Sequence, residues 1–112
     1  MTRSRNGGIT NNNEARFVVD ILKAFAIRYA NIRNIEIGVI SFYSEQVALL
    51  KEHVKHSDVL MWMKSNNISL QISTVDGFQG CEKDIIILSC VRSKWSGKSV
   101  FENVHLYFPI KN

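Results

Sequence analysis

The chain has 112 residues, of which 46% are hydrophobic and 21% are charged, which is ordinary for a globular domain with one core. No apolar run approaches the roughly 20 residues of a membrane span, and the basic start from Met1 to Gly8 lacks the apolar region of a signal peptide. These features exclude a membrane-spanning protein and predict an intracellular one, in the nucleus or cytoplasm. The net charge of +4 suits a nucleic-acid partner without requiring one.

Metal-binding and disulfide chemistry are also disfavoured by the composition. Cys81 and Cys90 are too few for a four-ligand zinc site and form no Cys-x-x-Cys motif, so we interpret both as reduced thiols. His53, Lys55 and His56 form a basic cluster at the end of a predicted helix, where cations complement the helix dipole. Since no carboxylate or cysteine stands at a metal-like spacing from them, the sequence predicts no metal site.

The first predicted element is a helix that follows a flexible, glycine-containing lead-in over residues 1–10. The asparagines at positions 11–13 can cap this helix, and Glu14 places a negative charge in its first turn. A single apolar face predicts a helix from Glu14 to about Ala30, because the apolar residues recur at three- and four-residue steps. These residues are Phe17, Val18, Ile21, Leu22, Phe25 and Tyr29.

A strand and a second helix are predicted next. Residues 35–42 alternate at first and are then continuously apolar, which predicts a strand, and Ser44 is placed to cap a helix over residues 45–54. A strand, a short turn and a capped helix form half of a parallel α/β unit. Residues 58–64 predict either a short helix or a buried connection; we favour a cover for the core over a partner-binding patch.

The most informative stretch is a polar loop between two strands. Residues 68–73 alternate as a strand and lead into Ser73–Asp84, which contains Gly77 and Gly80; four branched apolar residues then predict a buried strand over residues 85–90. Glycines allow a close approach of the backbone to a ligand. Polar groups at this density beside a buried strand indicate a binding site, with Phe78 as a core anchor rather than a base-stacking platform.

The end of the chain carries a motif that we reject. Gly97-Lys98-Ser99 looks like the end of a P-loop, but Arg92 stands where the first glycine of that loop is needed, so the phosphate-cradling loop is missing. Residues 104–108 either add a strand or pack on the surface.

Three segments together resemble a known family. Ser-Thr-Val-Asp-Gly-Phe-Gln-Gly-x-Glu-Lys-Asp, followed by Ile-Ile-Ile-Leu-Ser-Cys-Val-Arg-Ser, resembles motif V of the superfamily 1B helicases, and within them the upframeshift and senataxin group. Ile-Gly-Val-Ile-x-x-Tyr-x-x-Gln-Val-x-Leu-Leu is similar to their motif IV, with Phe42 where the family usually has proline. Asn-x-x-Glu-Ala resembles the helix before motif IV.

The resemblance covers residues 11–93 and implies a partial second RecA-like domain. Its fold would be α/β, a three-layer, P-loop NTPase-type parallel sheet flanked by helices and incomplete here, with residues 94–112 as a divergent tail. The resemblance implies nucleic-acid backbone contacts by Ser73, Thr74, Val75 and Asp76, and by the weaker candidates Tyr43 and Gln46. It implies nucleotide contacts by Gly80 and Glu82, with Gln79 between the two groups.

Each of these roles has a structural alternative. Thr74 can be an ordinary strand residue, Asp76 can cap its own loop, and Glu82 with Lys83 can be a solvated pair of little energetic value. This chain departs from the family at Cys81, where arginine or glutamine is usual. It therefore lacks the long polar side chain that would make one contact there.

The family also implies ATP and Mg²⁺ as cofactors, single-stranded RNA or DNA as the partner, and a first RecA-like domain that carries the Walker motifs. Three interpretations remain open. The chain is part of an ATP-dependent helicase and inactive alone, since it contains neither Walker motif nor the arginine of motif VI. Alternatively, it is a non-catalytic nucleic-acid- or protein-binding module derived from a helicase, or a fragment without a stable fold.

Overall fold

A four-stranded sheet and three helices make up the fold in this computed structural model, which describes residues 2–3, 9–30, 34–78, 80, 82–91 and 103–109. The strand order is β4-β3-β5-β6. Strand β3 (Ile35–Ser41) pairs in parallel with β4 (Ile68–Thr74) and with β5 (Ile85–Ser89), and β6 (Val104–Tyr107) joins β5 in antiparallel orientation. The predicted α/β class with a mostly parallel sheet is confirmed.

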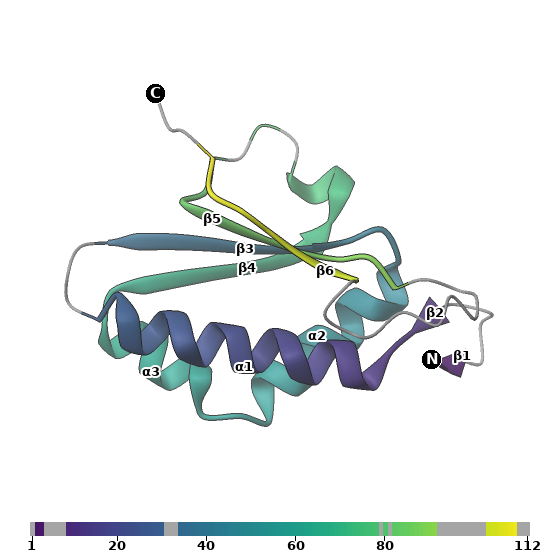
Figure 1. Cartoon of the computed structure of the whole chain (residues 1–112), viewed down its shortest axis with the longest axis horizontal. Coiled ribbons are helices and arrows are strands. Elements are labelled where there is room, and N and C mark those ends of the chain that lie inside the picture. The colour runs from purple at the N-terminus through teal and green to yellow at the C-terminus, as the bar shows by residue number, and fades with distance from the viewer. Residues whose placement is uncertain are drawn as a thin grey trace.

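The three helices lie together on one face of the sheet (Figure 1). They are α1 (Asn12–Arg28), α2 (Ser44–Lys55) and α3 (Val59–Ser65). Asn11 caps α1, because its Oδ1 accepts a hydrogen bond from the Glu14 amide at 3.0 Å. The predicted cap of α2 is wrong by one residue: Ser44 is already helical, and the N-cap is Tyr43, which makes no side-chain capping bond.

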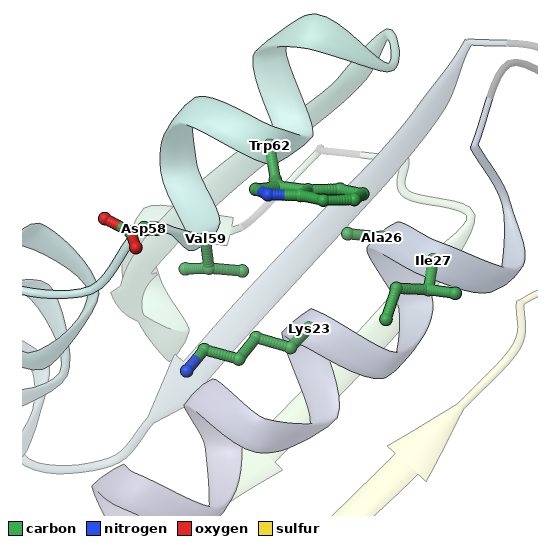
Figure 2. A pocket seen from close by; sticks show the side chains of 6 residues that line it. All are labelled: Lys23, Ala26, Ile27, Asp58, Val59 and Trp62. Carbon is green, nitrogen blue, oxygen red and sulfur yellow. The ribbon is translucent and has the colours of Figure 1, made fainter.

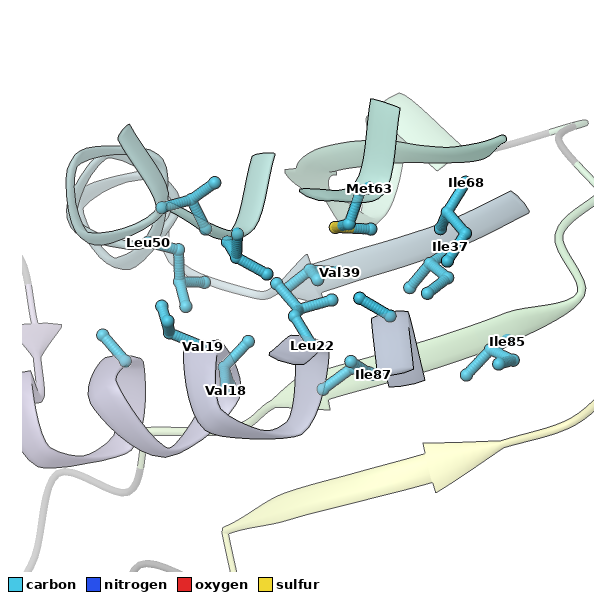
Figure 3. Packing of buried hydrophobic residues seen from close by; sticks show 14 of the residues in the cluster. Val18, Val19, Leu22, Ile37, Val39, Leu50, Met63, Ile68, Ile85 and Ile87 are labelled. Carbon is cyan, nitrogen blue, oxygen red and sulfur yellow. The ribbon is translucent and has the colours of Figure 1, made fainter. Parts of the chain in front are cut away.

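The core lies between these helices and the sheet (Figure 3). Ile37 and Val39 of β3 stand level with Ile85 and Ile87 of β5, and all four are buried. Leu22 of α1 is fully buried in the same cluster, as are residues from the other two helices. Burying each of these branched side chains contributes about 1.5–3 kcal/mol.

The opposite face of the sheet carries the short helix η1 (Val75–Phe78). Because side chains alternate along a strand, Gly38 faces away from the helices while its neighbours face the core. A Cβ atom on Gly38 would lie 2.2 Å from Cε1 of Phe78, so the phenyl ring occupies the space that a side chain would need. Phe78 is 7% exposed, which confirms its prediction as a core anchor.

The edge strand β6 and a second, two-stranded sheet complete the fold. Residues 104–107 add the edge strand β6, and Phe108 after it makes an edge-to-face contact with Phe25 of α1 at a centroid distance of 6.3 Å. Strands β1 (Thr2–Arg3) and β2 (Ile9–Thr10) form a small antiparallel pair that the sequence analysis did not predict. The rejected P-loop, residues 97–99, lies outside the described residues.

Candidate nucleic-acid interface at the carboxyl edge of the sheet

The polar loop runs from the carboxyl ends of the parallel strands to their amino ends. We call these two sides of the sheet its carboxyl edge and its amino edge. It leaves β4 at Thr74, which stands level with Ser41 at the end of β3. It re-enters the sheet at Asp84, whose amide donates to the Glu36 carbonyl at 2.8 Å while its Oδ2 accepts from the Glu36 amide at 2.7 Å. At about 3.3 Å per strand residue, the two ends are on the order of 15 Å apart. The two sets of predicted site residues therefore lie toward different ends of the loop.

Residues predicted to contact nucleic acid differ in their accessibility at the carboxyl edge. Thr74 is partly buried, and Val75 and Asp76 are exposed. The Ser73 hydroxyl instead donates to the Thr74 carbonyl at 3.0 Å, and a Cβ on Gly77 would lie 1.9 Å from that hydroxyl oxygen. Ser73 and Gly77 thus shape the loop, while Val75 and Asp76, which follow the partly buried Thr74, are exposed at this edge.

The turn after β3 lies at the same edge. The Tyr43 amide donates to Oγ of Ser41 at 3.4 Å, and Ser41 is fully buried. Tyr43 is partly buried, whereas Phe42 is 61% exposed. Tyr43 therefore lies at the same sheet edge as Thr74, as its predicted role requires.

Gln46 is fully buried, and both the oxygen and the nitrogen of its side-chain amide make hydrogen bonds. Its Oε1 accepts from the Asn11 amide at 2.9 Å, and its Nε2 lies 3.3 Å from both the Asn11 carbonyl and Oγ of Ser89. These bonds join the starts of α1 and α2 to the end of β5. A nucleic-acid contact by Gln46 stays a prediction, and its placement supports a structural role.

A buried carboxyl group lies beneath this edge. Oε1 of Glu14 accepts hydrogen bonds from the Ser89 hydroxyl at 2.5 Å and the Val91 amide at 3.0 Å. Burial raises the pKa of Glu14, while hydrogen bonds from Ser89, Val91 and Asn103 and the charge of His105 oppose that rise. Oε2 of Glu14 and Oδ1 of Asn103 are buried without a hydrogen bond of good geometry within the described residues.

Val91, which binds this carboxyl, has a left-handed backbone with φ of +46° and is fully buried. A β-branched residue in that region is strained. The sequence predicts for Glu14 only a favourable charge at the helix dipole. The helical spacing of Glu14 with Val18 and Leu22, all three buried, is the signal that would have placed it on the core face.

The side of the loop predicted to contact the nucleotide is open at Gly80. Gly80 has a φ of +83°, and a Cβ built on it would meet nothing within 4 Å. Glu82 is exposed. Gln79 and Cys81 lie outside the described residues, so the structure does not place the side chain predicted to lie between the two groups.

Sequence comparison with known proteins assigns the chain to a family. Residues 1–105 match the family described as AAA domain. The chain is 48% identical over 67 residues to the DNA polymerase alpha-associated DNA helicase A of Saccharomyces cerevisiae, covering 60% of the chain and 9% of that protein. It is 34% identical over 92 residues to the mouse DNA replication ATP-dependent helicase/nuclease DNA2, covering 82% of the chain and 8% of that protein. The chain belongs to the superfamily 1B helicases.

The matching region is a small part of each helicase. Helicase SEN1 of Saccharomyces cerevisiae is 34% identical over 94 residues, which cover 81% of the chain and 4% of that protein. The chain thus spans less than a tenth of the length of these three relatives. The similarity to superfamily 1B helicases confirms the expectation raised by motifs IV and V.

The residues present fit one side of the ATP that these helicases use. The open space around Gly80 allows close approach of a ligand, and the exposed carboxylate of Glu82 can accept a hydrogen bond from a hydroxyl group. They do not by themselves form a magnesium site, since the described part of the chain contains no group of three or more His, Cys, Asp or Glu that could hold a metal.

A separate cavity of about 260 Å³ lies between α1 and α3 (Figure 2). It is lined by Lys23, Ala26, Ile27, Asp58, Val59 and Trp62. None of the predicted site residues of the helicase motifs borders it. None of the described helices is both long and apolar enough to span a membrane.

Proposed function

We propose that this superfamily 1B chain binds the sugar-phosphate backbone of a single-stranded nucleic acid along the carboxyl edge of its sheet. Thr74, Val75 and Asp76 would form the contact surface, with Tyr43 beside them. The observation that carries the proposal is the exposed segment that follows Thr74 at this edge, which is where open α/β sheets bind ligands. A hydroxyl and backbone amides can hold phosphodiesters without reading bases.

Relatives support the same assignment. Their names include a DNA helicase and an ATP-dependent helicase/nuclease. In a longer helicase this chain would be the second RecA-like domain, and Gly80 and Glu82, with Gln79, would contribute to an ATP site shared with a first domain. ATP with Mg²⁺ would supply the energy for movement along the strand.

Binding by the purified chain is the first test. A labelled single-stranded oligonucleotide, DNA or RNA, should bind more weakly as salt rises from about 50 to 200 mM, because phosphate contacts release counterions. Thr74→Ala should weaken binding about tenfold, since it removes one hydrogen bond to a charged group. Thr74→Ser keeps the hydroxyl and should bind like the unmodified chain. Equal binding by the alanine variant, or none by the unmodified chain, would contradict the proposal.

Catalysis is expected to need more than this chain. No Walker A motif is found in the sequence, so a phosphate-release assay on the purified chain with ATP and Mg²⁺ should give background rates, with or without single-stranded nucleic acid. Turnover that depends on Glu82 would contradict this expectation.

A further inference from the structure

An exposed aromatic ring stands at the proposed binding edge. Phe42 is 61% exposed and follows the last residue of β3, and Val75 is 42% exposed and follows the last residue of β4. The residues before them, Ser41 and Thr74, are partners in the parallel register. Phe42 therefore lies at the same edge as Thr74 and next to the start of the proposed contact surface.

The local backbone holds Phe42 outside the core. On its N-terminal side, the buried Ser41 hydroxyl accepts the Tyr43 amide at 3.4 Å. On its C-terminal side, the Tyr43 carbonyl accepts the Val47 amide at 3.1 Å and begins α2. Because the turn is fixed at both ends, the ring projects to solvent instead of folding onto the sheet. Phe78 shows the contrast, since the chain buries that phenyl ring over Gly38.

The surroundings of Phe42 favour a nucleic-acid base over an apolar protein surface. A protein-docking patch needs several exposed apolar side chains in one area. At this edge Phe42 is joined by one exposed apolar residue, Val75, and the exposed polar residues Ser44 and Asp76 flank the two. Ile27, Met61 and Trp62, which are other large exposed apolar residues of the described chain, belong to α1 and α3 rather than to this edge.

We propose that Phe42 is a stacking platform for one base of the single strand whose backbone lies along Thr74 to Asp76. A flat ring beside a backbone-binding hydroxyl is the arrangement by which proteins hold single strands without reading sequence, since every base has a π-face. The inference rests on the proposed function and adds a base contact to it. It requires no base preference.

Anisotropy titrations of a labelled single-stranded oligothymidylate with the full chain test the inference. Phe42→Ala should weaken binding about 5- to 100-fold, the range for losing one base–aromatic stack. Phe42→Trp should bind at least as tightly as the unmodified chain. Phe42→Leu should resemble the alanine variant, because it restores apolar area without a flat ring. Trp62→Ala, an exposed aromatic on α3, is the matched control and should have no effect.

An oligonucleotide with abasic residues separates the two proposals. Backbone contacts survive on it, so the unmodified chain should still bind, and Thr74→Ala should still weaken binding. The effect of Phe42→Ala should disappear, because there is no base to stack. If Thr74→Ala weakens binding to oligothymidylate and Phe42→Ala does not, the stacking role is wrong and the backbone role stands. If Phe42→Leu binds like the unmodified chain, the contact is apolar rather than a stack, which overturns the inference. Absence of binding by the unmodified chain overturns both.

Discussion

Gly38→Ala is expected to lower the free energy of unfolding by about 2–3 kcal/mol, although alanine is among the smallest changes available. The new methyl group would lie 2.2 Å from Cε1 and 2.5 Å from Cζ of Phe78, so the ring and η1 must move away from the sheet. Overpacking of this kind costs about 1–3 kcal/mol. Urea denaturation of the variant and the unmodified chain measures the difference.

A double-mutant cycle identifies the cause of that loss. Phe78→Ala alone should cost about 3–4 kcal/mol through lost burial and a cavity. In the Phe78→Ala background the additional Gly38→Ala change should cost little, because the clash is gone. An equal cost of Gly38→Ala in both backgrounds would show that the effect belongs to the strand and not to the contact with the ring.

Glu14→Gln is expected to raise stability at neutral and alkaline pH and to remove part of the pH dependence of unfolding. Burial raises the pKa of Glu14 above its ordinary value of 4.5, so the fold favours the protonated form. The stabilisation from this protonation is present below the pKa of the unfolded chain and is lost as pH rises through the folded-state pKa. Glutamine stays neutral and keeps an oxygen that can accept from Ser89 and Val91.

Urea denaturation between about pH 4 and 8 should therefore show an advantage of Glu14→Gln that grows with pH. Asp20→Asn, an exposed change on the same helix, is the control and should follow the unmodified chain. Glu14→Ala should instead be less stable than the unmodified chain by about 2–4 kcal/mol at low pH, because the Ser89 hydroxyl and the Val91 amide are left unsatisfied, and this deficit should shrink as pH rises. An advantage for glutamine that shrinks as pH rises would contradict the assignment.

Most of the fold is predictable from sequence because its signals are local. The three- and four-residue apolar spacing predicted α1, and the continuous branched residues 85–88 predicted β5. The small β1–β2 pair was missed since two-residue strands carry no period. The start of α2 was predicted one residue late, because a serine before a helical pattern is a common cap, whereas Tyr43 holds that position here.

The site was harder to predict than the fold, since it depends on where strands end relative to one another. The loop sequence predicted a site, but the register and the Asp84–Glu36 hydrogen bond show that the two ends of the loop, Thr74 and Asp84, lie at opposite ends of the parallel strands. Burial of Gln46 depends on contacts with Asn11 and Ser89, which are 35 and 43 residues away in sequence. Spacing within one segment carries no information about such contacts.

The packing of Phe78 over Gly38 also lowers the conformational entropy that the loop would lose on binding a ligand. Fixing the backbone of one flexible residue costs about 1–2 kcal/mol, and a loop that becomes ordered only on contact loses that free energy from its affinity. Here Phe78 anchors the end of η1 against the sheet in the absence of a ligand. A nucleic-acid strand bound as we propose would therefore meet a loop anchored in advance, and we expect its association to be limited by encounter rather than by loop rearrangement.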